Sequence, residues 1–268
     1  TLTNAGNLIG DVDLNATSKN DVHLWSGSQI KGDLKIGSNA ESTLTLEGSN
    51  QQLYSDAVSG VTTFAGVLRM AGTGRWVLDQ ALNSVNTIID SGTLEVAHNN
   101  ALGSGEVNVG DTGTLQVNNG SVLTNVLNLK TGGTLTGTGT VGFTNAQSEA
   151  VIRGGDSATP HGTLTVAGNL DMQTGAILEV RVDPTSNQAS LVNVNGTATL
   201  TGSKVQHVGN VFNAASDFQT GVTYTILTAT RISGRFQSAA SDYAYLNATL
   251  GYLDIAREEV AASALNAT

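Results

Sequence analysis

The segment Gly92-Thr93-Leu94-Glu95-Val96 decides the fold, because it recurs along the chain as a Gly-Thr-Leu-x-Val motif. Full copies occupy residues 113–117 and 162–166, and weaker copies occupy residues 133–137 and 176–180. The central leucine moves by 21 residues and then by 20 between the first copies, and by 29 and 14 between the later ones. A loose period in this range is typical of a solenoid, in which each repeat is one coil that buries its apolar face against its neighbours.

The composition agrees with stacked short strands rather than with a core of packed rings. The chain has 268 residues, of which 32 are Gly and only 2 are Pro, while 13% are charged and 4% are aromatic. Glycine without a three-residue register excludes collagen, and the abundant Leu, Val, Ile and Thr argue against disorder. Aliphatic ladders therefore account for the core better than large rings do.

Charge and cysteine content limit the partners and the compartment. The formal net charge is −10, and because this charge repels a phosphate backbone we expect no nucleic acid partner. The absence of cysteine is compatible with an exported bacterial protein. No apolar run approaches the roughly 18 residues of a membrane-spanning helix, and no signal peptide opens the chain. Thr1 falls within a strand pattern, so we expect the chain to be a fragment of a longer precursor.

Short alternating segments run through residues 1–205, which we assign to a β-helical stalk. Early examples of apolar and polar residues in alternation are Asp11–Leu14, Val22–Trp25, Asp33–Ile36 and Thr43–Leu46. Residues 146–160 are polar and contain Pro160, which predicts a loop outside the coils.

Residues 206–260 differ in composition, since they contain four of the five Tyr and three of the five Phe. A solenoid needs a different composition at its ends, because an open end coil exposes backbone and core. We therefore predict a C-terminal β cap at 206–260. The Ala/Glu-rich stretch that begins nearby predicts the start of a linker or a helix, with the linker at 261–268.

Two segments of the chain resemble bacterial autotransporters, the type V secretion class. The first is similar to the passenger-associated β-strand repeat, in the pieces Ile88-Ile89-Asp90-Ser91-Gly92-Thr93-Leu94-Glu95-Val96, Asn100-Ala101-Leu102-Gly103-Ser104-Gly105 and Val107-Asn108-Val109. The second, 162–260, resembles the autochaperone region of pertactin-like and AIDA-like passengers, in Gly162–Val166, Gly168–Leu170, Leu191–Gly196, Tyr224–Leu227, Ile232–Phe236 and Leu250–Leu253.

This resemblance implies an all-β, right-handed parallel β-helix whose region 162–260 nucleates passenger folding outside the outer membrane. It also implies an outer-membrane β-barrel translocator in the same precursor as a partner, and a location at the bacterial cell surface. The motif match selects a folding nucleus, and the large area that the four bulky members can bury supports the choice. The predicted nucleus comprises Tyr224, Ile226, Leu227, Gly234 and Phe236.

No catalytic, cofactor-binding or metal-binding residue is predicted, and we expect no enzyme activity. Gly137-x-Gly139-x-x-Gly142 matches the dinucleotide fingerprint as a string, but no helical period follows it. Gly155-Asp156-Ser157-Ala158 resembles the start of a lipase family, and His161 is four residues after Ser157, but nothing identifies an orienting acid. The four His are scattered without the spacing of metal ligands.

Two pairs of residues leave alternatives open. Asp11 and Asp13 are alternate strand residues that either share a cation or form a solvated acidic edge. Trp25 and Trp76 either bind a ligand at the surface or pack inside.

Three functions follow as hypotheses. The favoured one is adhesion or self-association, leading to aggregation or biofilm, in which weak contacts to a host-surface ligand or to another copy are summed over many coils. The alternative is a passive stalk and folding module for an enzyme domain, a protease or esterase, upstream of Thr1. A carbohydrate-active β-helix is the third, but it needs acidic residues and Arg clustered on one face, and the sequence shows no such cluster.

Overall fold

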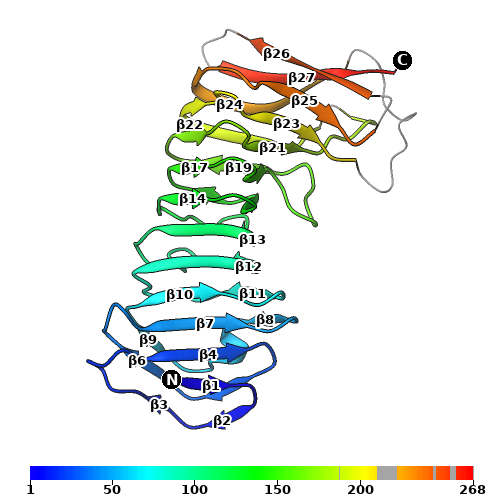
Figure 1. The fold of residues 1–268 in the computed structure, drawn as a ribbon. Coiled ribbons are helices and arrows are strands. Elements are labelled where there is room, and N and C mark those ends of the chain that lie inside the picture. The colour runs from blue at the N-terminus through cyan, green and yellow to red at the C-terminus, as the bar shows by residue number, and fades with distance from the viewer. Residues whose placement is uncertain (187, 210–221, 244–245, 254–257, 268) are drawn as a thin grey trace. The chain divides into compact units, whose positions relative to one another are not determined.

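The computed structural model describes residues 1–186, 188–209, 222–243, 246–253 and 258–267. Strands hold 53% of the described residues and helix only 2%. Most strands pair in parallel with strands one coil away, as Figure 1 shows. The predicted all-β class and parallel β-helix are therefore confirmed. The chain divides into a first compact unit, Thr1–Asn128 with Gly132–Thr134, and a second, Leu129–Thr131 with Leu135–Thr268. This division lies well before the predicted boundary at 205/206.

The first unit contains short strands joined by tight turns, and one helical turn, α1 (Tyr54–Ala57). Its strands are β1 (Leu2–Asn4), β2 (Asn7–Ile9), β3 (Val12–Asp13), β4 (Asp21–Trp25), β5 (Gln29–Lys31), β6 (Leu34–Gly37), β7 (Thr43–Glu47), β8 (Gln51–Leu53), β9 (Thr62–Phe64), β10 (Val67–Met70), β11 (Arg75–Leu78), β12 (Asn86–Val96) and β13 (Val107–Val117). The division between the units falls at β14 (Leu127–Leu129) and β15 (Thr134–Gly137).

Parallel pairing aligns the inward side chains of the first unit into columns. Strands β1, β4, β7, β10, β12 and β13 pair in that order. One column, fully buried, consists of Leu24, Leu46, Met70, Ile89 and Val109. Each such side chain contributes about 1.5–3 kcal/mol on burial, so the stacking of coils supplies the core that a single coil lacks. Three further parallel stacks are formed by β8–β11–β12, β2–β5 and β3–β6–β9.

The recurring motif begins at a bend inside a long strand. In β12 the register shifts between Ile89 and Ser91, and Gly92 follows with φ of 71°. A Cβ on Gly92 would lie 2.4 Å from the carbonyl oxygen of Gly72 in the preceding coil. Glycine is therefore required there both by its backbone conformation and by the close approach of the neighbouring coil.

The second unit continues the same parallel arrangement. Its strands are β16 (Thr140–Val141), β17 (Thr144–Ala146), β18 (Val151–Arg153), β19 (Thr163–Val166), β20 (Leu170–Met172), β21 (Ile177–Val180), β22 (Leu191–Thr199), β23 (Lys204–His207), β24 (Thr223–Ser233), β25 (Ser238–Ser241), β26 (Leu246–Leu253) and β27 (Glu258–Ala267). Three parallel stacks are β16–β19–β22–β24, β17–β20–β22 and β18–β21–β23–β25. The loop predicted at 146–160 is wrong for residues 151–153, because Val151 and Ile152 continue the parallel ladder as β18.

The pairing changes direction near the C-terminus. Strand β24 is parallel to β22 but antiparallel to β27, which is also antiparallel to β26. The predicted cap thus contains antiparallel strands, although its residues 210–221, 244–245 and 254–257 lie outside the described residues. Residues 261–267, expected in a linker, belong to β27.

Candidate functional site

Polar side chains on the outer surface of the first unit reach diagonally from coil to coil. His23 aligns with Thr45, yet its Nδ1 lies 2.8 Å from Oε1 of Glu47, two residues farther along. Arg69 aligns in the same way with Ile88, and its Nε donates to Asp90 at 2.6 Å. These diagonal pairs link neighbouring coils through their side chains in addition to the backbone ladder.

A third diagonal pair is more buried and belongs to a network. Arg75 forms an ion pair with Glu95, whose side chain is only 10% exposed. Nδ2 of Asn118, one coil farther, donates to Oε1 of Glu95 at 2.5 Å, and Nε2 of Gln116 donates to Oδ1 of Asn118 at 3.2 Å. Because the carboxylate receives an ion pair and an amide hydrogen bond, its burial is compensated.

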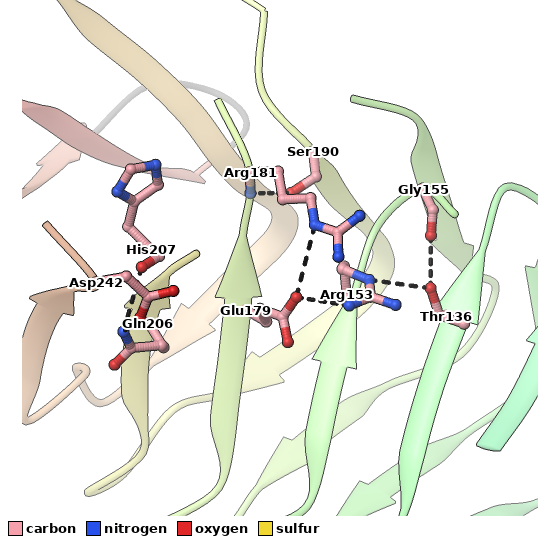
Figure 2. Close-up of polar contacts among 9 residues, drawn as sticks. All are labelled: Thr136, Arg153, Gly155, Glu179, Arg181, Ser190, Gln206, His207 and Asp242. Atoms are coloured by element: carbon pink, nitrogen blue, oxygen red, sulfur yellow. Dashed lines mark hydrogen bonds and ion pairs between the residues drawn. The ribbon is translucent and has the colours of Figure 1, made fainter. Parts of the chain in front are cut away.

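The second unit differs in placing two arginines on one carboxylate (Figure 2). Nη1 of Arg153, on β18, donates to Oε1 of Glu179 on β21 at 2.6 Å, and these residues are direct neighbours in the parallel register. Nε of Arg181 lies 3.8 Å from the same oxygen. We call these three residues the arginine cluster. Their side chains are 17–28% exposed, so they can meet a ligand at the surface.

Polar contacts hold the arginine cluster in place. Nε of Arg153 donates to Oγ1 of Thr136 at 3.3 Å, and the Thr136 hydroxyl donates to the carbonyl oxygen of Gly155 at 2.6 Å. The backbone of Arg181 is bound by Ser190, whose Oγ accepts from its N–H at 3.0 Å and whose own N–H donates to its carbonyl oxygen at 2.7 Å.

The electrostatics of the cluster are unbalanced. Burial is the main cause that lowers the pKa of Arg181, the charge of Arg153 lowers it further, and Glu179 opposes both. An arginine stays protonated despite such a shift. Two cations therefore share one anion, which leaves a local charge of +1 in a chain whose formal net charge is −10.

The polar column continues to the next coil. Gln206 on β23 aligns directly with Glu179, and its Nε2 donates to Oδ1 of Asp242 at 2.8 Å. The neighbouring His207 is buried, its Nδ1 lies 2.9 Å from Oγ of Ser241, and burial lowers its pKa while Asp242 acts in the opposite direction. Figure 2 shows Gln206 on the coil beside the arginine cluster and Asp242 next to it, on the following coil.

A neutral hollow of about 330 Å³ lies among the turns of the first unit. It is lined by Asn83, Ser84, Asn100, Gly103, Ser104 and Thr124. Asn100 has φ of 58°, a left-handed conformation that asparagine tolerates. The hollow therefore presents amide, hydroxyl and backbone groups without a charged side chain.

The predicted folding nucleus lies at the start of the antiparallel region. Tyr224, Ile226, Leu227 and Phe236 are buried, and the Tyr224 hydroxyl donates to the carbonyl oxygen of Asp183 at 3.2 Å. Gly234 has φ of 80°.

Tyr252, on β26, contacts the residues around Phe236. Its hydroxyl oxygen accepts from the N–H of Phe236 at 2.9 Å, and Arg235 lies 4.5 Å from the centroid of its ring. The nucleus is thus brought together with β26, a contact that the sequence did not indicate. Its role in folding stays a prediction.

The structure gives the contacts of Asp11, Asp13 and the two tryptophans, for which the sequence leaves alternatives open. Asp11 accepts from the N–H of Asp33 at 2.8 Å, and Asp13 lies 3.6 Å from Nζ of Lys35. Trp25 is 44% exposed, whereas Trp76 is fully buried and its Nε1 donates to the carbonyl oxygen of Glu47.

The motifs weighed for catalysis occupy structural positions. Asp156 accepts hydrogen bonds from the N–H groups of Ala158 and Thr159 and thus closes a turn. The Gly137–Gly142 string lies across β15 and β16, with a strand where the dinucleotide fingerprint needs a helix. Within the described part of the chain, no group of three or more His, Cys, Asp or Glu is placed to hold a metal.

No helix among the described residues is long and apolar enough to cross a membrane. No model of a known protein family matches this sequence, and a search of curated proteins finds no significant match.

Proposed function

We propose that the chain is part of an autotransporter passenger that acts at the bacterial surface in adhesion or self-association, and that its region 162–260 directs the folding of the passenger. The observation that carries the proposal is the in-register stacking of coils, which brings polar side chains into repeating outward columns.

Stacking favours binding that is weak at each coil and strong in sum. Strands in a sheet lie about 4.8 Å apart, so a ligand or a second copy that contacts one coil meets related groups on the next. The neutral hollow and the arginine cluster add two local sites with different chemistry. Linked weak contacts raise the overall affinity without any single strong site.

The folding role is supported by the change in pairing at the C-terminus. A coil cannot bury its apolar face alone, so coils add most easily to a preformed edge. Strand β24 offers such an edge, because β27 covers its other side with antiparallel pairing. The buried side chains of Tyr224, Leu227 and Phe236 supply the packing for this starting structure.

The test is to display the 268-residue segment on its translocator in non-adherent bacteria and to measure settling and surface attachment against the translocator alone. Protease resistance of the displayed segment shows that it is folded. We expect faster settling or greater attachment with the segment. A folded segment without either effect would favour the alternative, a passive stalk and folding module for an enzyme domain upstream.

A further inference from the structure

The arginine cluster stands out among the ion pairs of the described residues, because it is the only one in which two guanidinium groups meet one carboxylate. Elsewhere the pairing is one to one, as in Arg69–Asp90 and Arg75–Glu95. A cluster that served only to join coils would be complete with Arg153 and Glu179, which already bond at 2.6 Å.

Arg181 is the member with capacity for another anion. Its Nε is 3.8 Å from Glu179, beyond hydrogen-bonding distance, and its side chain is the most exposed of the three. A guanidinium group carries five N–H donors in a planar fork that matches a carboxylate in bidentate geometry. The partly buried position strengthens such a bond relative to one in open water.

The surroundings select the kind of anion. On the neighbouring coil, Gln206 offers its amide oxygen as a hydrogen-bond acceptor, since its Nε2 already donates to Asp242 and to the carbonyl oxygen of His207. Asp242, bonded to Gln206, follows on the next coil, and the whole chain is acidic. An extended polyanion would be repelled by these charges. A single carboxylate on a neutral, hydroxyl-rich molecule would instead meet the arginines as donors, while Gln206 and Asp242 would accept hydrogen bonds from its hydroxyl groups.

We propose that Arg181 and Arg153 bind the carboxylate of an acidic sugar residue, with Gln206 and Asp242 beside its hydroxyl groups. This proposal rests on the proposed adhesive function and names the class of ligand, an acidic sugar, that the surface would bind. A single sugar makes few contacts, so the dissociation constant is expected on the order of 1 mM.

Binding is tested by titrating the 268-residue chain with glucuronic acid and following the ligand and protein NMR signals. Glucose serves as the neutral control and dextran sulfate as the polyanion. We expect glucuronic acid to bind and glucose to bind at least tenfold more weakly. Tight binding of dextran sulfate without binding of glucuronic acid would overturn the proposal, and so would a lack of binding by both.

Three variants locate the site. Arg181→Gln is expected to weaken glucuronic acid binding about tenfold or more, because it removes a charge-assisted bond. Glu179→Gln is expected to strengthen binding severalfold, because it removes the competing internal carboxylate while its amide oxygen still accepts from Arg153. Arg69→Gln, which breaks a comparable pair in the first unit, is expected to leave binding unchanged.

Separate controls distinguish a variant that is unfolded from one that is folded but does not bind. Circular dichroism and protease resistance show whether each variant is folded, and Arg181→Lys, which keeps the charge but loses the fork, replaces Arg181→Gln if that variant is unfolded. Equal binding by wild type and all Arg181 variants would refute the site. If cells that display the segment adhere but the chain does not bind glucuronic acid, the proposed function stands and this site is refuted. If the chain binds glucuronic acid but the cells do not adhere, the site stands and the adhesive function is refuted.

Discussion

The coils of the first unit and the C-terminal strands of the second cover their strand edges in different ways. In the first unit, strands β4, β7, β10 and β12 each have a parallel neighbour on both sides, and the core is a set of aliphatic columns. At the C-terminus β24 is parallel to one neighbour and antiparallel to the other, and the buried residues include Tyr224 and Phe236. Repetition extends a solenoid, but a change of pairing direction is needed to end it.

The largest expected effect is a loss of stability when one large buried side chain, Trp76, is removed from the core of the first unit. Trp76→Ala removes a fully buried ring and its bond to the Glu47 carbonyl oxygen, so the free energy of unfolding should fall by about 3–5 kcal/mol. Trp25→Ala, at a position 44% exposed, is the matched control and should cost less than about 1 kcal/mol. Urea denaturation of both variants makes the measurement, and equal losses would contradict the assignment of Trp76 to the core.

The next prediction separates stability from folding. Leu44→Ala and Leu227→Ala remove the same side chain from fully buried positions in the two regions, so each should cost about 2–5 kcal/mol at equilibrium. If region 162–260 nucleates folding, the yield of protease-resistant passenger at the cell surface should fall more for Leu227→Ala, and likewise for Tyr224→Ala and Phe236→Ala. Equal yields for Leu44→Ala and Leu227→Ala would remove the nucleation proposal.

A smaller effect compares two glycines with the same backbone conformation. Gly120 and Gly234 both have φ of 80°, so alanine at either should cost about 1–2 kcal/mol. A Cβ at Gly120 meets nothing within 4 Å, whereas at Gly234 it would lie 2.7 Å from Oγ1 of Thr201. Thermal unfolding should therefore show a larger loss for Gly234→Ala. Adding Thr201→Ala should reduce the difference, although the backbone N of Thr201 would still lie 3.3 Å from the new Cβ. If the double variant keeps the full loss, the contact with Thr201 is not its cause.

The smallest effect concerns pH near the C-terminal strands. Burial lowers the pKa of His207 below its ordinary value of 6.5, so the folded state binds a proton less readily than the unfolded state. The contribution of neutral His207 to the free energy of unfolding should therefore be fully present above about pH 6.5. It should decline as the pH falls toward the lower pKa of His207 in the folded state. Unfolding between pH 7 and 5 should show this decline in the wild type and a weaker one in His207→Gln. If the free energy of unfolding falls with pH equally in both proteins, protonation of His207 is not a cause of the decline.

The ion pairs between coils could not be predicted from the sequence. The pairing offset is 22 residues from Val22 to Leu44, 24 from Leu44 to Leu68, and 26 from Arg153 to Glu179. Each offset depends on the length of the intervening turns, so the sequence motif did not indicate which carboxylate Arg153 would meet. The polarity of residues 146–160 further hid the strand that carries Arg153.

The sequence by itself determined many of the strands, the parallel solenoid and the aromatic character of the C-terminal region, because alternation and the Gly-Thr-Leu-x-Val repeat are local patterns that recur from coil to coil. Only the tertiary structure decided the register between coils, the burial of Glu95, the reversal of pairing at β27 and the meeting of Arg153 and Arg181 at Glu179. The physical reason is that all of these features need contacts between coils, which join residues about 20 or more positions apart and whose alignment is set by turn geometry and packing rather than by any short pattern.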